Sequence, residues 1–218
     1  MSSGKNSHDH GISHYHDLDV SRNKTQQLKE IYADWASTYD RDNDGKLATV
    51  SQPNAVAILT QHLTNKDAAI LDVGCGTGLV GHHLALNGFT NFSGTDLSQD
   101  MLDQAKGRGY RNLFAADAEA GLPVEDNAYD ACLCVGVFTH GHVGPEGFEE
   151  LLRITRPGGI IIFTVNEGVW QKDGFDKAVA AHLDAGNWKE LSRIKQGYML
   201  NENVEAWYIA VQKATISP

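Results

Sequence analysis

The chain has 218 residues, a net charge of −10 at pH 7, 41% hydrophobic and 21% charged residues. This length suffices for one domain with a substantial core, and the composition is ordinary for a soluble globular protein. The negative charge argues against a nucleic-acid partner, which requires Lys and Arg to neutralise phosphates. No apolar run approaches the ~20 residues of a membrane span, and no signal-peptide core is visible, so we expect a cytoplasmic protein with no membrane partner.

The first 20 residues are polar and contain four histidines: His8, His10, His14 and His16. Two His-x-His pairs are able to bind a transition metal. A segment so poor in apolar residues is more typical of a disordered tail, which we predict for residues 1–20.

Helical periodicity begins after Ser21. Apolar side chains that share one helix face are Leu28, Ile31, Tyr32, Trp35 and Tyr39. This helix either packs on the domain or covers the mouth of a binding site.

The next stretch, Asp40 to Gly45, imitates the start of a calcium loop. Its twelfth position is Ser51, where such a loop needs a glutamate. We therefore predict a solvated turn, followed by a helix that Pro53 opens.

The run from Ala68 to Val73 predicts a strand that is buried on both faces of a parallel sheet. Three glycines follow at alternate positions, Gly74, Gly76 and Gly78, and a helix is predicted over 79–86. Strand, glycine turn and helix form the ligand-binding corner of a doubly wound α/β domain. Glycine there permits a positive φ and close approach of a ligand.

The glycine spacing discriminates between ligands. A dinucleotide fingerprint has the pattern G-x-G-x-x-G, which places a pyrophosphate at the helix N-terminus. Here the pattern is G-x-G-x-G, and Asp72 stands two residues before the first glycine. A carboxylate would repel a pyrophosphate and attract an ammonium or sulfonium group in a partly desolvated site. This favours S-adenosylmethionine as the ligand.

Two further acids follow predicted strands. The strand from Asn91 ends on Asp96, where the two hydroxyls of a ribose would bind, each bond contributing roughly 1.5–3 kcal/mol. The strand that begins near Leu113 leads to Asp117, which is suited to accept from an adenine amino group. A single Asp after a strand is more often a helix N-cap, but three beside a glycine corner favour a ligand site.

At these residues the sequence resembles the class I S-adenosylmethionine-dependent methyltransferases. The similarity spans residues 69–165 and is carried by ILDVGCGTG, GTDLS, AADAEAGLP, YDACLCVGVF and LLRITRPGGIIIFTV. With YADWASTYDRD upstream, the chain is most similar to the methyltransferase-like protein 27 group. The resemblance implies a Rossmann-like α/β fold with a doubly wound, mostly parallel seven-stranded sheet, an antiparallel closing hairpin and an N-terminal lid helix.

The resemblance also implies S-adenosyl-L-methionine as cofactor and S-adenosyl-L-homocysteine as product. We expect Asp72 to border the methionyl ammonium, Leu97 to cover the adenine face, and the Ala118 N–H to meet a ring nitrogen. The aromatic lid residues would lie against the sulfonium. The complete predicted cofactor set is Asp72, Gly74, Cys75, Gly76, Gly78, Asp96, Leu97, Met101, Asp117, Ala118, Val135, Trp35 and Tyr39.

A fourth strand is predicted over 129–135, and the loop after it, 136–145, should border the transferred methyl group. In-line transfer mainly requires alignment, which can supply ~7–11 kcal/mol of the barrier. A base is needed only if the acceptor loses a proton. His140 is the best candidate for that base and His142 the second, although either could instead pin the loop through backbone hydrogen bonds.

The remaining elements are predicted as a helix over 146–155, a turn over 156–159, a strand over 160–165, a helix over 170–186 and a hairpin over 188–213. Cys75, Cys132 and Cys134 are expected to be buried thiols, and no metal site is expected.

The acceptor pocket is expected between the lid helix, the 136–145 loop and residues 166–171, with Phe138, His142 and Trp170 as substrate residues. Because two of these are apolar, we predict a small organic acceptor. A protein acceptor, or a non-catalytic S-adenosylmethionine-binding protein, is the alternative, and a nucleotide-dependent oxidoreductase is disfavoured by the glycine spacing.

We therefore expect a monomer or homodimer with one methyltransferase domain over 21–218. Its parts would be the helices and lid in 21–66, the cofactor-binding core in 67–165, and the acceptor-side helix and hairpin in 166–218.

Overall fold

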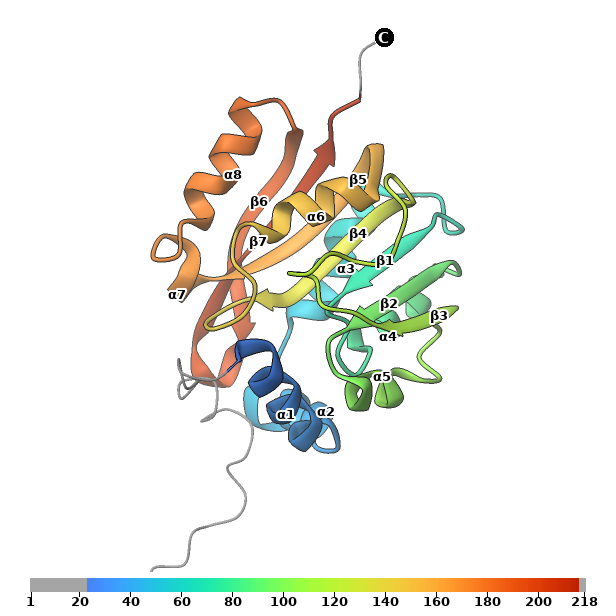
Figure 1. Ribbon diagram of the computed structural model, residues 1–218, viewed down its shortest axis with the longest axis vertical. Coiled ribbons are helices and arrows are strands. Elements are labelled where there is room, and N and C mark those ends of the chain that lie inside the picture. Colours follow the sequence, from blue (N-terminus) through green and yellow to red (C-terminus); the bar gives the residue numbers. More distant parts are fainter. Residues whose placement is uncertain (1–22, 216–218) are drawn as a thin grey trace, which may run out of the picture.

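The computed structural model describes residues 23–215, so the predicted tail over 1–20 lies outside the described residues (Figure 1). The strands are β1 Ile70–Val73, β2 Phe92–Asp96, β3 Asn112–Ala115, β4 Tyr129–Phe138, β5 Thr155–Asn166, β6 Trp188–Met199 and β7 Val204–Lys213. The α-helices are α1 Lys24–Ala36, α2 Tyr39–Arg41, α3 Ser51–His62, α4 Leu79–Leu86, α5 Gln99–Ala105, α6 Gly147–Ile154, α7 Glu167–Trp170 and α8 Phe175–Asp184. A π-helix, η2 Asp42–Leu47, and a 3-10 helix, η3 Leu200–Glu202, complete the elements.

The strands form one seven-stranded sheet in the order β3-β2-β1-β4-β5-β7-β6. β1 to β5 pair in parallel, and β7 runs antiparallel between β5 and β6. The predicted α/β class, the mostly parallel sheet and the antiparallel closing hairpin are therefore confirmed.

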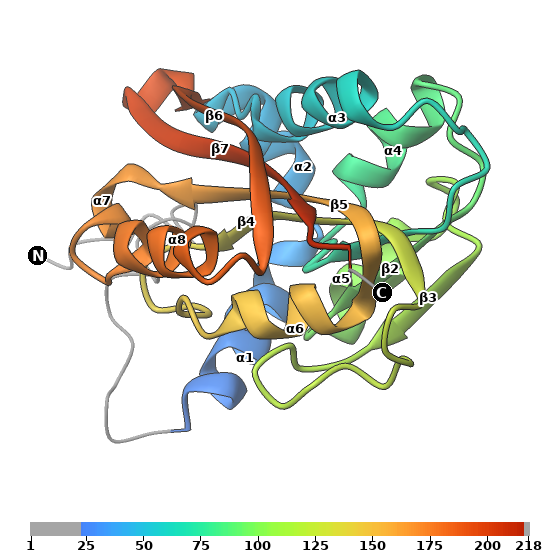
Figure 2. The ribbon, with the colours of Figure 1, turned by 90° about the horizontal axis from the view of Figure 1, so that it is seen from above.

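Helices cover both faces of this sheet, α3 and α4 on one face and α6 and α8 on the other (Figure 2). Successive strand residues alternate between the two layers: in β1, Ile70 packs toward α3 and α4, and Leu71 packs with α6 and α8. This double burial is why the central strands are continuous apolar runs. Cys132 and Cys134 lie in the α6 and α8 layer, and all three cysteines are buried free thiols, as predicted.

The structure corrects three predicted element boundaries. The turn predicted over 156–159 belongs to β5, which begins at Thr155 and not at Ile160. β4 continues through Phe138, beyond its predicted end at Val135, with a register shift between Cys134 and Phe138. The helix predicted over 170–186 is two helices, α7 and α8, because the chain turns between them and Gly174 adopts a positive φ of 80°.

The solvated turn predicted over 40–45 is wrong. Asp42 is 6% exposed and Asn43 is 3% exposed, and both belong to η2. An Asp42 carboxylate oxygen accepts hydrogen bonds from the Trp35 indole N–H at 3.1 Å and from the Thr38 hydroxyl at 3.2 Å. The carboxylate is buried because it satisfies the indole N–H of α1.

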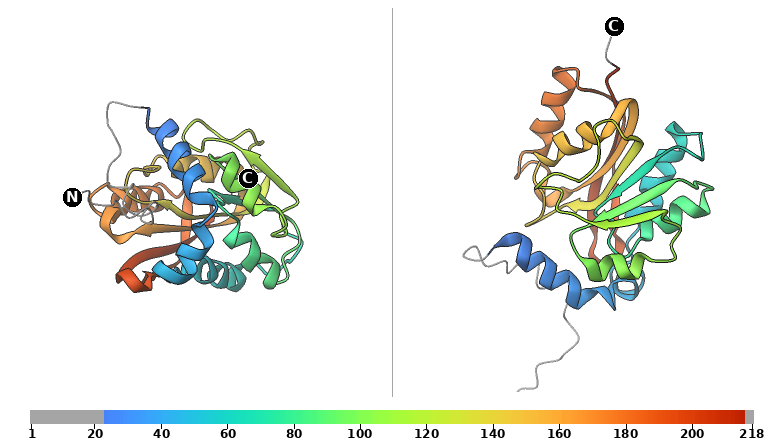
Figure 3. Two further views of the ribbon diagram at one scale, coloured as in Figure 1. Left: turned by 90° about the horizontal axis from the view of Figure 1, so that it is seen from below. Right: turned by 45° about the vertical axis from the view of Figure 1, so that its right-hand side comes forward.

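α1 lies across the edge of the sheet at which the parallel strands end (Figure 3). In Figure 1 it is the blue helix below the arrowhead of β4. None of the helices in residues 23–215 has the length and apolar character required to cross a membrane.

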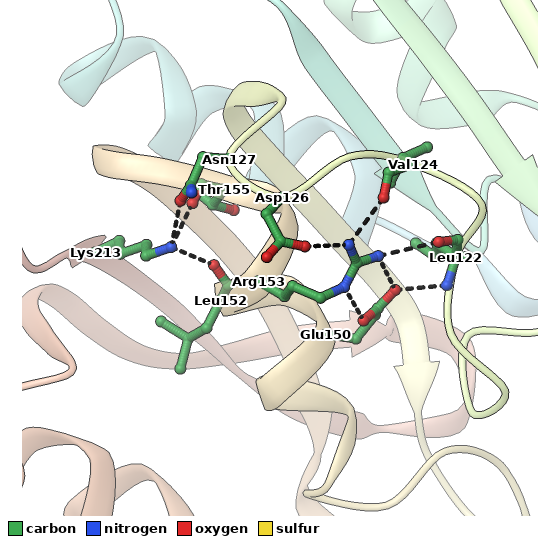
Figure 4. Close-up of polar contacts among 9 residues, drawn as sticks. All are labelled: Leu122, Val124, Asp126, Asn127, Glu150, Leu152, Arg153, Thr155 and Lys213. Atoms are coloured by element: carbon green, nitrogen blue, oxygen red, sulfur yellow. Dashed lines mark hydrogen bonds and ion pairs between the residues drawn. The ribbon is translucent and has the colours of Figure 1, made fainter.

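An arginine-centred cluster fastens the segment that follows β3 to α6 (Figure 4). The Arg153 guanidinium pairs with Glu150 at 2.8 Å and with Asp126 at 2.7 Å. It also donates to the carbonyl oxygens of Leu122 at 3.0 Å and Val124 at 2.8 Å. The cluster thereby positions Leu122, which lines the first of the cavities described next.

Candidate active site

A first cavity lies where β1, β2 and β4 end, beneath α1. Its walls include Lys24 and Thr25 of α1, and Glu119 and Leu122 from the segment after β3. The predicted cofactor residues that line it are Tyr39, Gly74, Gly76, Asp96, Leu97, Asp117, Ala118 and Val135. The structure thus gathers side chains from five separated stretches at one sheet edge, as expected for ligand sites in doubly wound sheets.

The glycine corner is folded tightly against β2. The N–H groups of Gly74 and Cys75 both donate to the carbonyl of Thr95, at 2.8 and 2.9 Å. Gly74 has a φ of 72°, and a Cβ there would lie 2.2 Å from a Val137 methyl. At Gly76, whose φ is 53°, a Cβ would meet no atom within 4 Å, so this backbone borders open space. A ligand can therefore approach the chain closely at Gly76.

Asp96 holds the corner from the end of β2. One carboxylate oxygen accepts from the Gly76 N–H at 2.8 Å, and the other accepts from the Ser98 N–H at 2.9 Å. Burial raises the pKa of Asp96, and these backbone N–H groups act in the opposite direction. The carboxylate lines the first cavity and retains lone pairs for further donors.

Asp72 lies behind the cavity wall and is fully buried. Its Oδ2 accepts from the Tyr110 hydroxyl at 2.6 Å, and Oδ1 is buried with no hydrogen-bond partner among the described residues. Burial raises the pKa of Asp72 to about 7; the Tyr110 hydrogen bond lowers it, and the charge of Asp96 raises it further. Tyr110, which also accepts from the Gly81 N–H at 3.0 Å, is a site residue that the sequence reasoning missed.

The first turn of α1 is bonded to the segment after β3. The Thr25 hydroxyl donates to Asp117 Oδ2 at 3.3 Å. Lys24 Nζ donates to Glu119 at 2.7 Å and to the carbonyl of His142 at 2.6 Å. We call these three contacts the latch.

The chain beyond α1 is attached to the glycine corner. Asp40 forms an ion pair with Arg108 and accepts from the Thr77 hydroxyl at 2.5 Å. The ring of Tyr39 packs edge-on against Trp35 with centroids 4.6 Å apart. Burial and the nearby Asp96 raise the pKa of Tyr39 to about 12, so its hydroxyl is a donor at neutral pH.

A second cavity of about 410 Å³ adjoins the first. Tyr32, Tyr39, Val135 and Gly136 line both. The second cavity's other walls come from α1, η2, the loop after β4, the start of α7 and the turn between β6 and β7. Three of these regions were predicted to build an acceptor pocket, whereas η2 and the hairpin turn were not.

The two candidate histidines lie in different places. His140 lines the second cavity and His142 lines the first. Burial and the neighbouring Lys24 ammonium lower the pKa of His142 to about 4, so its ring is neutral at pH 7. Its ring also lies 3.4 Å from the Tyr32 hydroxyl.

Several other predicted cofactor residues do not line the first cavity. Cys75 and Met101 are buried and line neither cavity, and Gly78 faces Tyr110. Trp35 lines the second cavity and not the first.

The two aromatic residues predicted to contact the acceptor pack in the core. Phe138 is surrounded by the rings of Phe148, Phe163 and Phe175, and Trp170 packs against Trp207 with ring centroids 5.1 Å apart and planes inclined by 32°. Neither lines the first or the second cavity. The extension of β4 through Phe138 accounts for its burial.

Sequence reasoning also missed wall residues that come from the end of the hairpin: Tyr198, Met199, Glu202 and Val204. No local motif marks them, because only the antiparallel pairing of β6 with β7 brings them to this edge. Tyr32 was visible in the helical stripe, but its place between the two cavities depends on how α1 lies across the sheet.

A family model described as a methyltransferase domain matches residues 71–163. Methyltransferase-like protein 27 of Homo sapiens is 34% identical over 172 residues, which are 76% of this chain and 69% of that protein. Demethylmenaquinone methyltransferase of Clavibacter sepedonicus is 31% identical over 202 residues, which are 87% of this chain and 79% of that protein.

Among solved structures, magnesium protoporphyrin IX methyltransferase from Synechocystis PCC 6803 with bound S-adenosylmethionine superposes with a TM-score of 0.65. The match covers 90% of this chain and 100% of that chain at 13% identity, which shows a shared fold. Together with the sequence relatives and the topology of the sheet, these similarities confirm the predicted resemblance. The chain belongs to the class I S-adenosylmethionine-dependent methyltransferases and is similar to methyltransferase-like protein 27.

Proposed function

We propose that this methyltransferase binds S-adenosylmethionine in the first cavity and methylates a small organic acceptor held in the second. The observation that carries the proposal is the shared wall formed by Tyr32, Tyr39, Val135 and Gly136. A methyl group at this wall would be exposed to both cavities. In-line displacement needs this kind of alignment and little else from the protein.

The donor and acceptor groups of the first cavity suit the proposed cofactor. Asp96 offers a carboxylate for the ribose hydroxyls, and Asp117 offers one for the adenine amino group. The open backbone at Gly76 leaves room beside them. Asp72 lies behind the same corner with its Oδ1 unpartnered among the described residues, and in its ionised form it would attract an ammonium group. When bound, the cofactor supplies an electrophilic methyl group on a sulfonium.

The second cavity supports a small acceptor over a protein side chain. Its walls come from α1, the loop after β4, α7 and the hairpin turn, so they surround a volume of about 410 Å³ from several sides. His140 lies on this wall and is our candidate for a general base where the acceptor must lose a proton. The base would contribute about 10²–10⁴-fold in rate.

Calorimetric titration with S-adenosylmethionine and S-adenosylhomocysteine tests the cofactor site. We expect the wild type to bind both, and Asp96→Asn to bind both about tenfold more weakly, because a neutral amide is a poorer acceptor for two hydroxyls. Asp184→Asn, an exposed acid at the end of α8, serves as the matched control. An unchanged affinity of Asp96→Asn for both nucleosides would contradict the assignment of Asp96 to the ribose hydroxyls.

Acceptor screening then tests turnover. Small-molecule libraries and cell-protein fractions should be compared for formation of S-adenosylhomocysteine. A response confined to the protein fraction would contradict the small-molecule proposal.

A further inference from the structure

Part of the wall of the second cavity is aromatic. Tyr32, Trp35, Tyr39 and Tyr198 all line it. The Tyr32 and Trp35 rings are nearly parallel with centroids 6.5 Å apart, and Tyr39 stands edge-on to Trp35. Such faces carry negative electrostatic potential and attract cations, by about 0.5–1 kcal/mol at exposed sites and more when desolvated.

The charged residues on the cavity's rim are acidic. Glu167 and Glu202 line the cavity, and among its described lining residues there is neither Lys nor Arg. Lys195 pairs with Glu167 at 2.9 Å and with the neighbouring Glu205 at 2.7 Å. Lys195 thus has two carboxylate partners, and Glu202 adds a further negative charge to the cavity lining.

Aromatic walls and a negative rim select against anionic acceptors. A carboxylate or phosphate entering the cavity would meet Glu202 and Glu167 with no lining cation to pair with. A positively charged ligand would be attracted by both the rim and the ring faces. The overall charge of −10 acts in the same direction during approach.

We propose that the methyl acceptor is a small aromatic amine-bearing molecule that enters the second cavity as a cation. This inference rests on the proposed function and specifies its substrate class. The ring system of the acceptor lies among the aromatic walls, and its ammonium group is attracted by the carboxylates of Glu167 and Glu202.

Transfer to an amine is balanced by loss of one proton. The ammonium first gives a proton to a base, for which His140 on the cavity wall is placed, and its nitrogen gains a free electron pair. That pair forms the bond to the methyl carbon while the carbon–sulfur bond breaks and its electrons stay on sulfur. The methylated nitrogen takes the positive charge that the sulfonium loses.

The test uses two probes that share an indole ring and differ in charge, tryptamine and indole-3-propionate. The full-length protein is first titrated with S-adenosylhomocysteine; absence of this binding would overturn the proposed function itself. The saturated complex is then titrated with each probe at low salt. We expect tryptamine to bind about tenfold more tightly than indole-3-propionate. Equal affinity, the reverse order, or no binding of tryptamine overturns the amine proposal while leaving the cofactor site intact.

The variant Glu202→Gln tests whether the carboxylates that line the cavity cause the preference for tryptamine over indole-3-propionate. We expect the ratio of the two affinities to fall about threefold, with S-adenosylhomocysteine affinity unchanged, because the neutral amide no longer attracts a cation. Glu125→Gln, an exposed acid in the loop before β4, should leave the ratio as it is. A ratio that Glu202→Gln retains in full overturns the role given to the acidic rim.

Mass spectrometry of the tryptamine reaction with S-adenosylmethionine should show the N-methyl product; methylation of indole-3-propionate alone overturns the proposal.

Discussion

Tyr110 occupies a slot that three glycines leave open behind the glycine corner. A Cβ at Gly81 would lie 2.3 Å from its ring, and one at Gly94 or Gly78 would lie 2.8 or 2.9 Å away. The hydroxyl at the end of this slot bonds to Asp72 and to the Gly81 N–H. Of the three corner glycines, Gly76 borders open space, whereas Gly78 makes room for a side chain.

Asp72→Asn is expected to change how stability depends on pH. Its folded pKa of about 7 exceeds the ordinary value of 3.8, so ionisation of Asp72 opposes folding. This penalty is absent at low pH, grows as the pH rises through the interval between these two values, and is complete above pH 7. The variant should therefore gain stability relative to wild type across that interval, by on the order of a few kcal/mol at most.

Urea unfolding at several pH values from about 5.5 to 8 measures this difference, with Asp184→Asn as the exposed control. A difference between variant and wild type that is flat with pH would contradict the burial argument. The same variant should bind S-adenosylmethionine more weakly at pH 8, because the charge behind the corner is lost.

The latch connects α1 to the proposed adenine site. Asp117 Oδ2 accepts from Thr25, and Asp117 Oδ1 accepts from the Glu119 N–H at 2.9 Å. α1 and the proposed ligand would thus use the same carboxylate. The position of α1 and the binding of a ligand to Asp117 in the first cavity are therefore expected to depend on each other.

Lys24→Ala is expected to loosen α1. The Lys24–Glu119 pair is partly exposed, so its loss costs about 1 kcal/mol or less, together with the bond to the His142 carbonyl. Hydrogen exchange of the α1 amides should become about threefold to tenfold faster, while that of α8 stays unchanged. Lys29→Ala, an exposed lysine on the same helix, is the control. Equal exchange in the two variants would show that the latch does not hold the helix.

The Arg153 cluster joins parts of the chain that are far apart in sequence. Besides the contacts of Arg153, Lys213 at the end of β7 donates to Asn127, to the Leu152 carbonyl and to the Thr155 carbonyl, at 2.7, 2.8 and 2.8 Å (Figure 4). These bonds connect the carboxyl end of β7, the carboxyl end of α6 and the loop before β4. This cluster supports the sheet as a unit.

Arg153→Met should lower global stability. Glu150, whose side chain is 14% exposed, would keep only the Leu122 N–H as a donor within residues 23–215, and two carbonyl groups would lose the guanidinium. Because Arg153 itself is 31% exposed, solvent offsets part of the loss, and we expect about 1–3 kcal/mol. This corresponds to a fall of roughly 2–10 °C in Tm by calorimetry. Arg111 pairs with Asp67 at an exposed position, so Arg111→Met should shift Tm little. Equal Tm shifts in the two variants would contradict the greater stabilisation assigned to the Arg153 cluster.

The order of the central elements could be predicted because their signals are local. Buried parallel strands are continuous apolar runs, and the glycine corner follows the first of them directly. The helix over Leu79–Leu86 has the predicted bounds, and the Ser98 side chain caps α5. The carboxylates Asp96 and Asp117 were recognisable because parallel strands end at one edge, so residues that follow different strands meet there.

The second cavity could be predicted only in part: α1, the loop after β4 and the start of α7 were expected to border a pocket, whereas the remaining walls meet only after long-range packing. Tyr198 and Glu202 reach it through the antiparallel pairing of β6 and β7. The burial of Asp42 is likewise a tertiary effect, since its carboxylate accepts from the Trp35 indole N–H. Phe138 and Trp170 are the kind of side chain that lines pockets, yet Phe138 is packed among phenylalanine rings and Trp170 against Trp207. Local chain chemistry established the cofactor class, while the shape and charge of the acceptor side arose from contacts between distant segments, which no local pattern records.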